Sequence, residues 1–345
     1  MSIFRNPIHM KQTGFSMVEL MVALVLGLFL TVAVLQTFIG AKQAYEYQQE
    51  FSRIQENGRF AMIFLTKDIR AADFWGCNSA ITVKSNLVGD VNAGQYAAGI
   101  LGSDAVPSST SGYAPVLGPL ADAIVIQGGR GGGISVIQTG SSGASSAQIK
   151  LDKLNHPLGS TIADGDILMV SDCSNAEIFQ VTSIQNSNVT VVHGTGGGHV
   201  PGNQDNFLDD FFGDDAQVFI AEGLRYWLRP GTSGEPALVR GSERDLWSGG
   251  DELVEGVENL QILYGVDSTG DKTPNYFVPA DQVSSATTSM SDVVSVQVHL
   301  LVRSLRDNML DEPRALEYYG LSRVANDRRL RKAFTSTVAI RNRQD

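Results

Sequence analysis

Residues 15–35 read FSMVELMVALVLGLFLTVAVL, and this stretch decides how the chain begins. As a helix rising 1.5 Å per residue, the stretch is about 32 Å long, which matches a membrane hydrocarbon core of about 30 Å. Arg5 and Lys11 precede it, and no acidic residue occurs before Glu19. This charge pattern predicts a single membrane pass with a cytoplasmic N-terminus and the remaining chain outside.

Glu19 is the feature that an ordinary membrane segment does not explain. A carboxylate at the centre of a membrane helix costs about 2.5–3.5 kcal/mol on insertion scales, and less near the interface. A cleaved secretory signal would have a shorter apolar region followed by a small-residue cleavage site, and none stands out beyond Leu35. A plain signal anchor accounts for the length and the charges but leaves Glu19 without a role.

The residues around Glu19 resemble the processing site of type IV prepilins. That family has a short basic leader, a Gly, an aromatic residue or Met, and a Glu four residues after the cut, as Lys11, Gly14, Phe15 and Glu19 provide. The resemblance implies that residues 1–14 are a leader, that prepilin peptidase cuts between Gly14 and Phe15, and that the new Phe15 amine is methylated.

The resemblance also gives Glu19 a role in assembly and register. Residues four apart share a helix face, and an anion is favoured in the first turn. The carboxylate of Glu19 can therefore form an ion pair with the cationic amine of Phe15, either in its own chain or in a neighbouring subunit. The sequence leaves these two alternatives open.

The helical pattern continues beyond the membrane segment. We expect a transmembrane half over 15–35 and an amphipathic half over 36–74, with the rest of the chain, 75–345, as a β-rich domain. The amphipathic half carries an apolar stripe at steps of three or four, which predicts packing on the protein's own domain. The stripe consists of Tyr47, Phe51, Ile54, Gly58, Ala61, Leu65 and Ile69.

Short strand-like runs bounded by turn residues dominate after Trp75. The run VVSVQVHLLVR, residues 293–303, alternates apolar and polar side chains and predicts a half-buried antiparallel strand. Segments 103–118, 128–147 and 194–206 are rich in Gly and Ser, and we expect loops there. The predicted fold class is α+β, with a long N-terminal transmembrane and amphipathic helix packed on a large antiparallel β-rich domain.

Several distal stretches are similar to PilW-type minor pilins. They are CNSAITV (77–83), DILMVSDCSNAEIFQVTSI (166–184), LVEGVENLQILYGVDSTGD (253–271), DVVSVQVHLLVRS (292–304) and AFTSTVAIRNR (333–343). The resemblance implies a pilin-like fold and a structural minor pilin that joins other minor pilins in an inner-membrane complex. That complex primes polymerisation of the major pilin and then stays at the pilus tip.

The same resemblance implies the partners and the compartment. The partners are prepilin peptidase, the other minor pilins, the major pilin and a tip adhesin. The protein would sit in a Gram-negative inner membrane with its globular domain in the periplasm. A J-type minor pseudopilin of a type II secretion system is the first alternative, and a tip module that binds DNA or an adhesin is the second.

The two cysteines, Cys77 and Cys173, take their meaning from the compartment. Outside the cytoplasm they are expected to pair, and inside it they would remain thiols. A disulfide would tie the end of the long helix to a central strand. In the chain-entropy model a closed loop of about a hundred residues stabilises by up to about 4.7 kcal/mol.

Composition and spacing argue against other functions. The formal net charge of -11 disfavours a general nucleic-acid binder. The basic cluster Arg328, Arg329, Arg331 and Lys332 is expected to pair with acidic neighbours. No histidine lies beside a plausible nucleophile in the sequence, so we expect no enzyme. We also expect no cofactor and no metal.

One calcium-like pattern is a weak candidate for a metal site. Asp267, Thr269 and Asp271 alternate as ligands do in calcium loops. The stretch lacks the Gly and the distal Glu of an EF-hand. A solvated turn is the favoured interpretation.

Overall fold

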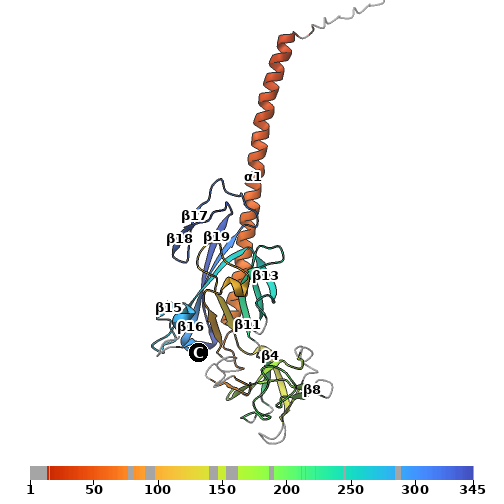
Figure 1. Cartoon of the computed structure of the whole chain (residues 1–345), viewed down its shortest axis with the longest axis vertical. Coiled ribbons are helices and arrows are strands. Elements are labelled where there is room, and N and C mark those ends of the chain that lie inside the picture. The colour runs from red at the N-terminus through yellow and green to blue at the C-terminus, as the bar shows by residue number, and fades with distance from the viewer. Residues whose placement is uncertain are drawn as a thin grey trace, which may run out of the picture. The chain divides into compact units, whose positions relative to one another are not determined.

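The computed structural model describes residues 14, 16–76, 81, 83–89, 98–139, 147–152, 162–185, 190–210, 212–213, 215–221, 223–243, 246–283 and 289–344. The chain divides into two compact units, residues 1–51 and 52–345. Helix α1 (Met17–Arg70) begins in the first unit and ends in the second. The described structure confirms the α+β class, with a long N-terminal apolar helix and a large antiparallel β-rich domain (Figure 1).

The remaining elements all belong to the second unit. The helices are α2 (Ser108–Ser111), α3 (Ala280–Val283), η4 (Met290–Asp292) and η5 (Arg341–Arg343). The strands are β1 (Val83–Ser85), β2 (Ile100–Ser103), β3 (Ala123–Ile126), β4 (Arg130–Thr139), β5 (Gln148–Leu151), β6 (Ile167–Ser171), β7 (Ala176–Gln180), β8 (Ser183–Gln185), β9 (Thr190–Val192), β10 (Gln217–Ile220), β11 (Leu224–Pro230), β12 (Pro236–Ser242), β13 (Asp251–Glu255), β14 (Val257–Val266), β15 (Tyr276–Val278), β16 (Val293–Arg303), β17 (Ala315–Tyr318), β18 (Leu321–Val324) and β19 (Arg331–Ala339).

The strands form four sheets. An eight-stranded sheet has the order β1-β7-β6-β10-β4-β5-β9-β8, and a five-stranded sheet has the order β13-β12-β11-β3-β2. The order β15-β14-β16-β19 makes a four-stranded sheet, and β17 pairs with β18 in a hairpin. Among the described pairs only β1 with β7 is parallel, so the antiparallel expectation is confirmed.

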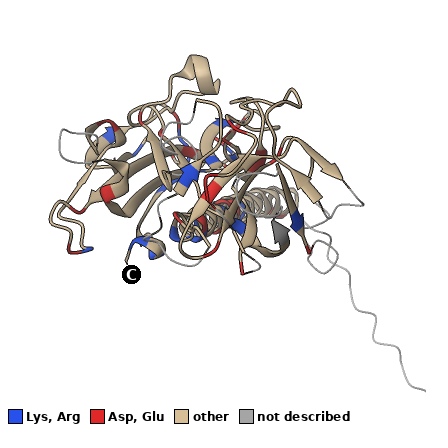
Figure 2. Ribbon diagram, turned by 90° about the horizontal axis from the view of Figure 1, so that it is seen from below, with Lys and Arg blue, Asp and Glu red and all other residues tan. Residues whose placement is uncertain are grey.

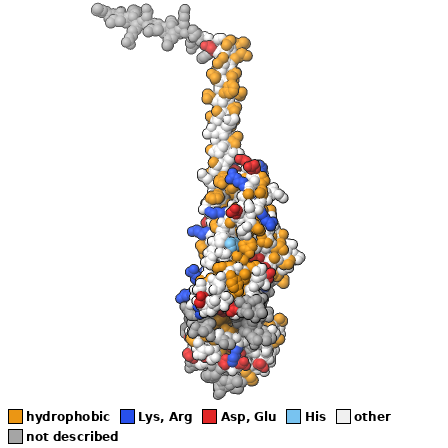
Figure 3. Space-filling model, turned by 90° about the vertical axis from the view of Figure 1, so that its left-hand side faces the viewer, with side chains coloured by type: hydrophobic (Ala, Val, Ile, Leu, Met, Phe, Trp, Pro, Cys, Tyr) orange, Lys and Arg blue, Asp and Glu red, His pale blue; other side chains and the backbone are white. Residues whose placement is uncertain are grey.

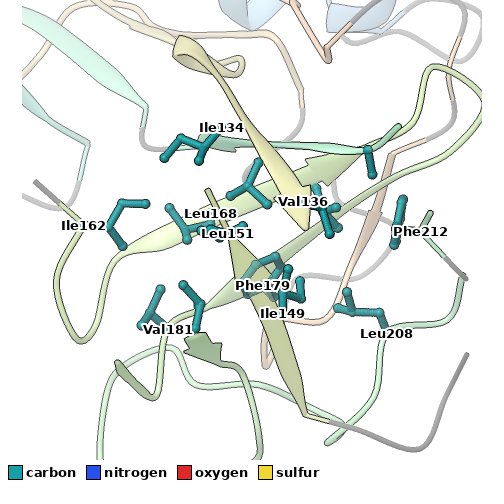
Figure 4. Packing of buried hydrophobic residues seen from close by; sticks show 14 residues of the cluster. Ile134, Val136, Ile149, Leu151, Ile162, Leu168, Phe179, Val181, Leu208 and Phe212 are labelled. Atoms are coloured by element: carbon teal, nitrogen blue, oxygen red, sulfur yellow. The ribbon is translucent and has the colours of Figure 1, made fainter. Parts of the chain in front are cut away.

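The eight-stranded sheet curls around an apolar core of its own (Figure 4). Ile134 and Val136 of β4 contribute to this core together with Leu168 of β6 and Phe179 of β7. In Figure 4 labelled side chains from β4, β5, β6 and β7 lie close to those of Leu208 and Phe212 from the segment before β10. This core is separate from the cluster around Trp227 of β11, which serves the five-stranded sheet.

The expectation of a loop over 128–147 is wrong for β4. Strand β4 pairs with β10 and β5, and the apolar alternation of Ile134 and Val136 fills the core. The glycines allow this pairing, because a Cβ at Gly133 would lie 2.1 Å from the Gln217 carboxamide oxygen. A glycine run therefore served close approach between strands rather than a loop.

The long helix ends at Arg70, whereas the sequence predicted helix through residue 74. A turn follows, and Asp73 takes a positive φ of 62°. The amide of Asp73 donates to the Gln127 carbonyl at 2.9 Å. The chain leaves the helix because its backbone begins to bond with the end of strand β3.

Strand β16 is more deeply buried than the predicted half-buried strand. Val294, Val296, Val298, Leu300 and Val302 are buried as expected. On the opposite face Ser295 and Leu301 are buried as well. Leu301 packs in a cluster with residues of the β17–β18 hairpin, so the hairpin covers part of the face that was expected to meet solvent.

Candidate functional site

The first part of the candidate site is the start of helix α1. The Ser16 amide donates to the Glu19 carboxylate at 3.0 Å, and the Val18 amide donates to the Ser16 hydroxyl at 3.3 Å. Ser16 therefore caps the helix through the amide of Val18, and Glu19 accepts from the amide of the cap residue, which is one half of a capping box. Glu19 therefore helps to cap the start of its own helix, without any contact to a second chain.

The two processing residues, Gly14 and Phe15, come directly before this cap. Gly14 is exposed and a Cβ there would meet no atom within 4 Å. Phe15 lies outside the described residues, so cleavage and methylation there stay predictions. A cut after Gly14 would leave Phe15 and the capping residue Ser16 as the first two residues of the chain.

The helix after Glu19 presents an exposed apolar surface among the described residues. In the described chain, α1 is the one helix long and apolar enough to cross a membrane. Its apolar side chains from Met17 to Ile39 are exposed, as Figure 3 shows along the N-terminal part of the helix. Large exposed apolar surfaces are unstable in water, so this part of the helix requires an apolar environment.

The second part of the site is the seat of α1 on the β-rich unit, where residues 52–70 pack. Gly58 is the closest point, because a Cβ there would lie 2.2 Å from the ring of Phe334 on β19. One residue earlier, the Asn57 side chain donates to the Glu255 carbonyl at 2.8 Å. Of the predicted stripe, Ile54, Gly58, Ala61, Leu65 and Ile69 are buried. The packing of the stripe on the protein's own domain is confirmed for these residues.

A polar contact fixes the rotation of the helix near its end. The Tyr226 hydroxyl donates to the Asp68 carboxylate at 2.5 Å, and Arg240 lies 3.6 Å from the same carboxylate. Burial, followed by the hydrogen bond to Asp68, raises the pKa of the Tyr226 hydroxyl above its ordinary value. The tyrosine therefore stays protonated and remains a donor to the helix.

The last described residues of the chain form hydrogen bonds to the turn that follows α1, and this set of contacts is called the clasp. The Arg343 guanidinium donates to the Asp73 carboxylate at 2.5 Å and to the carbonyls of Val293 at 2.7 Å and Ala98 at 2.8 Å. The neighbouring Asn342 side chain donates to the Ala72 carbonyl at 2.8 Å. Arg343 thus connects the turn after α1 to the segments that contain Val293 and Ala98.

The basic cluster is used inside the β-rich unit. Arg329 pairs with Glu235 at 3.0 Å, and Arg331 pairs with Glu258 at 2.7 Å and with Asp327 at 2.5 Å. The interpretation that this cluster pairs with acidic neighbours is confirmed for these two arginines.

The other two cations of the cluster also contact the unit itself. Arg328 donates to the Asn308 side chain at 3.0 Å, and Lys332 lies 5.4 Å above the Phe334 ring. Figure 2 shows basic and acidic residues interspersed along the ribbon.

The calcium-like loop uses its carboxylates for its own backbone. Asp267 accepts from the amides of Thr269, Gly270 and Lys272 at 2.9, 2.7 and 2.7 Å. These donors hold the pKa of the exposed Asp267 carboxyl below its ordinary value, against the opposing effect of desolvation. Asp271 caps the Thr273 amide at 2.9 Å. Among the described residues no group of three or more His, Cys, Asp or Glu side chains could hold a metal.

The two cysteines are only partly placed. Cys173 lies at an exposed turn between β6 and β7 with a positive φ of 71°. Cys77 lies outside the described residues, so the disulfide stays a prediction. Its neighbour Gly76 is described, and a Cβ at Gly76 would lie 2.7 Å from the Ser171 hydroxyl. The chain before Cys77 therefore passes next to the end of β6, two residues before Cys173.

Three of these features were not found from the sequence. The spacing Ser16-x-x-Glu19 is a capping-box signature and could have been recognised. The contact of Gly58 with Phe334 and the clasp of Arg343 on Asp73 join segments far apart in the sequence. No local sequence pattern indicates contacts between residues so far apart in the chain.

Two family models match the chain. The model described as Type IV Pilus-assembly protein W matches residues 225–342, and the prokaryotic N-terminal methylation motif matches residues 9–35. The first range includes β19 and Asn342, and the second includes Gly14 and Glu19. No curated protein and no solved structure gives a significant match to the chain.

Proposed function

Because the chain is a type IV pilin-like protein, we propose that it is a minor pilin that helps to prime pilus assembly within a complex of minor pilins. Its role is structural, and the matched families are in general structural rather than catalytic. The globular domain lies in the periplasm while the protein is in the inner membrane, and it is carried to the pilus tip after assembly.

The observation that carries the proposal is the combination of the two matches at opposite ends of one chain. The methylation motif covers the start of α1, and the PilW match covers strands that seat the end of α1. An exposed apolar helix requires lipid or neighbouring helices. The helix of a pilin is surrounded first by lipid in the membrane and then by neighbouring helices in the filament, so it is covered at both stages.

Glu19 supports an assembly role beyond anchoring. Its carboxylate already caps the helix through Ser16. After cleavage, the amine of Phe15 appears one residue before that cap. At 4 Å an ion pair is worth about 4 kcal/mol at an effective dielectric of 20, before desolvation is subtracted. In lipid such a pair fixes the axial register better than apolar contacts, since lipid tails compete with those.

The experiment that tests the proposal is deletion of the gene with complementation by the full-length chain. We expect the deletion to abolish or sharply reduce surface pili and complementation to restore them. Normal piliation in the deletion strain would contradict the proposal. A lost secreted protein with intact pili would instead assign the chain to the secretion alternative.

A role in binding DNA has less support, because Arg329 and Arg331 are already paired within the unit. Cation contacts to phosphate carry most of the affinity for nucleic acid. Binding of DNA by the full-length protein at low salt, lost when Arg328 is neutralised, would favour that alternative over a purely structural role.

A further inference from the structure

Strand β19 forms one end of the four-stranded sheet. It pairs with β16 in a regular register, from Ser295 opposite Ala339 to Arg303 opposite Arg331. The Ile340 amide donates to the Val294 carbonyl at 3.0 Å and fixes the phase of the ladder. In an antiparallel pair the bonded residues alternate. Even-numbered residues of β19 therefore bond to β16, and odd-numbered residues direct their amides and carbonyls outward.

This outward edge is open in the part of the chain that the structure describes. No described residue donates to or accepts from the backbone of its odd-numbered positions Ala333, Thr335, Thr337 and Ala339. The side chains of Thr335, Thr337 and Ala339 are exposed. A regular row of unsatisfied backbone groups is a template for one more strand.

The other described sheet edges are protected against such pairing. Strand β13 carries Asp251, Glu252 and Glu255, and its register with β12 shifts. The end strands β15, β1 and β8 are three residues long, and β2 is four. Strand β19 has nine residues, and no charged side chain occurs from Ala333 to Ile340. Short strands, charges and irregular pairing protect natural edges, and beyond Arg331 and Lys332 at its start β19 lacks all three.

The charges at the two ends of β19 select the occupant. Lys332 and Arg341 flank the uncharged stretch, and Arg331, next to Lys332, is already paired with Glu258 and Asp327. A second copy paired antiparallel about Ser336 would bring Lys332 diagonally beside Arg341 at each end, and a parallel copy in register would place Lys332 beside Lys332 and Arg341 beside Arg341. Like charges opposite each other destabilise a strand pair, so the edge disfavours its own copy.

We propose that β19 accepts an extended strand with an uncharged centre and acidic ends from a different pilin-like subunit. Backbone hydrogen bonds along the row supply affinity, and the basic ends supply specificity, as in other cases of strand addition. The inference rests on the proposed function, because it names the chemistry of the partner in that assembly.

The test places a photo-crosslinking residue at Thr337 of the full-length chain in cells that assemble the surface structure. We expect a crosslink to an extended, acid-flanked segment of another pilin-like subunit, identified by mass spectrometry of the joined peptides. The same residue at Thr269, in an exposed turn outside the sheet edge, is the control. A crosslink at Thr337 no stronger than at Thr269, or one to β19 of a second copy, would overturn the proposal.

Two variants separate the backbone from the side chain. Thr337→Pro removes an outward amide that β16 does not use, and edge strands tolerate Pro at such a position. With the crosslinker moved to Thr335, we expect Thr337→Pro to lower the crosslink yield by roughly two- to tenfold, the effect of one net hydrogen bond. Thr337→Val keeps the amide and is expected to leave the yield unchanged. Equal yields in both variants would count against strand addition.

A further variant keeps the test decisive if Thr337→Pro does not fold. Thr337→Lys leaves the backbone intact and adds a charge to the edge, and it should lower the yield in the same way. Failure of the two proposals is distinguishable. Pili lost on gene deletion without a crosslink at Thr337 would refute only the strand addition. Normal pili on deletion together with the crosslink would refute only the assembly role.

Discussion

The guanidinium of Arg343 and the carboxylate of Asp73 lie 2.5 Å apart, although 270 residues separate them in the sequence. The exposed fractions of the two side chains are 8% and 16%. The pair joins the end of the chain to the turn that follows α1. Removal of one partner would leave the other charge buried without its counterion.

We predict that Arg343→Ala destabilises the protein by about 3–5 kcal/mol, the usual effect of breaking a buried pair. Thermal unfolding of the full-length protein in detergent measures the loss. Arg341→Ala is the matched control, because Arg341 is exposed and two positions away. Similar melting temperatures for both variants would show that the clasp on Asp73 contributes little.

A second prediction concerns the helix seat at Gly58. A Cβ there meets the Phe334 ring at 2.2 Å, so Gly58→Ala must displace the ring. Overpacking of this kind destabilises by about 1–3 kcal/mol, partly offset by the helix propensity of Ala, worth about 1 kcal/mol.

The control for Gly58 lies in the same helix. A Cβ at Gly40 meets nothing within 4 Å, so Gly40→Ala should leave the melting temperature unchanged or raise it. In the double variant Gly58→Ala with Phe334→Leu, part of the lost stability should return, because the smaller side chain makes room. Additive losses in the double variant would contradict the proposed contact.

A third prediction concerns pH. Burial raises the pKa of the Glu177 carboxyl to about 7, and Asp209 donates its amide to it at 2.8 Å. The folded protein therefore binds this proton more tightly than the unfolded chain does. The free energy of unfolding should rise as the pH falls from about 8 to about 5, by roughly 1–3 kcal/mol from this group.

The substitution Glu177→Gln removes that titration and keeps an oxygen for the Asp209 amide. Unfolding at pH 8 and pH 5 should then differ less than in the unmodified protein. Burial also raises the pKa of Asp122 to about 7, so part of the slope will remain. Asp164→Asn, at an exposed carboxylate, is the control for loss of a surface charge. An unaltered slope in Glu177→Gln would contradict the assignment.

A fourth prediction concerns Glu19. Glu19→Ala should leave cleavage after Gly14 largely intact, while incorporation into pili falls sharply, because the proposed register contact to the Phe15 amine would be lost. Immunoblots of membranes and of sheared pili measure the two steps separately. Glu19→Gln keeps an oxygen that can accept from the Ser16 amide, so it separates helix capping from charge. Full incorporation of Glu19→Gln would show that capping is sufficient and that the charge is not required.

Much of the fold was predictable because its signals are local. The long apolar run after Phe15 indicates a membrane helix, and the alternation in residues 293–303 indicates a strand. Strand β4 was missed because its glycines resemble a loop, and only the neighbouring Gln217 shows why they are needed.

The candidate site divides in the same way. Gly14, Phe15 and Glu19 lie within six consecutive residues, so the sequence alone could indicate them as a local motif. The Arg343 clasp depends on carbonyls of Val293 and Ala98, which belong to distant segments. Contacts between distant segments follow from the packing of the whole domain, and a single sequence does not encode them in any local pattern.

The most direct test of the account is the N-terminus of the protein recovered from sheared pili, determined by mass spectrometry. The account predicts a chain that begins at N-methylated Phe15, present at low abundance beside the major pilin. A chain that still begins at Met1, or one absent from pili while abundant in the membrane, would contradict it.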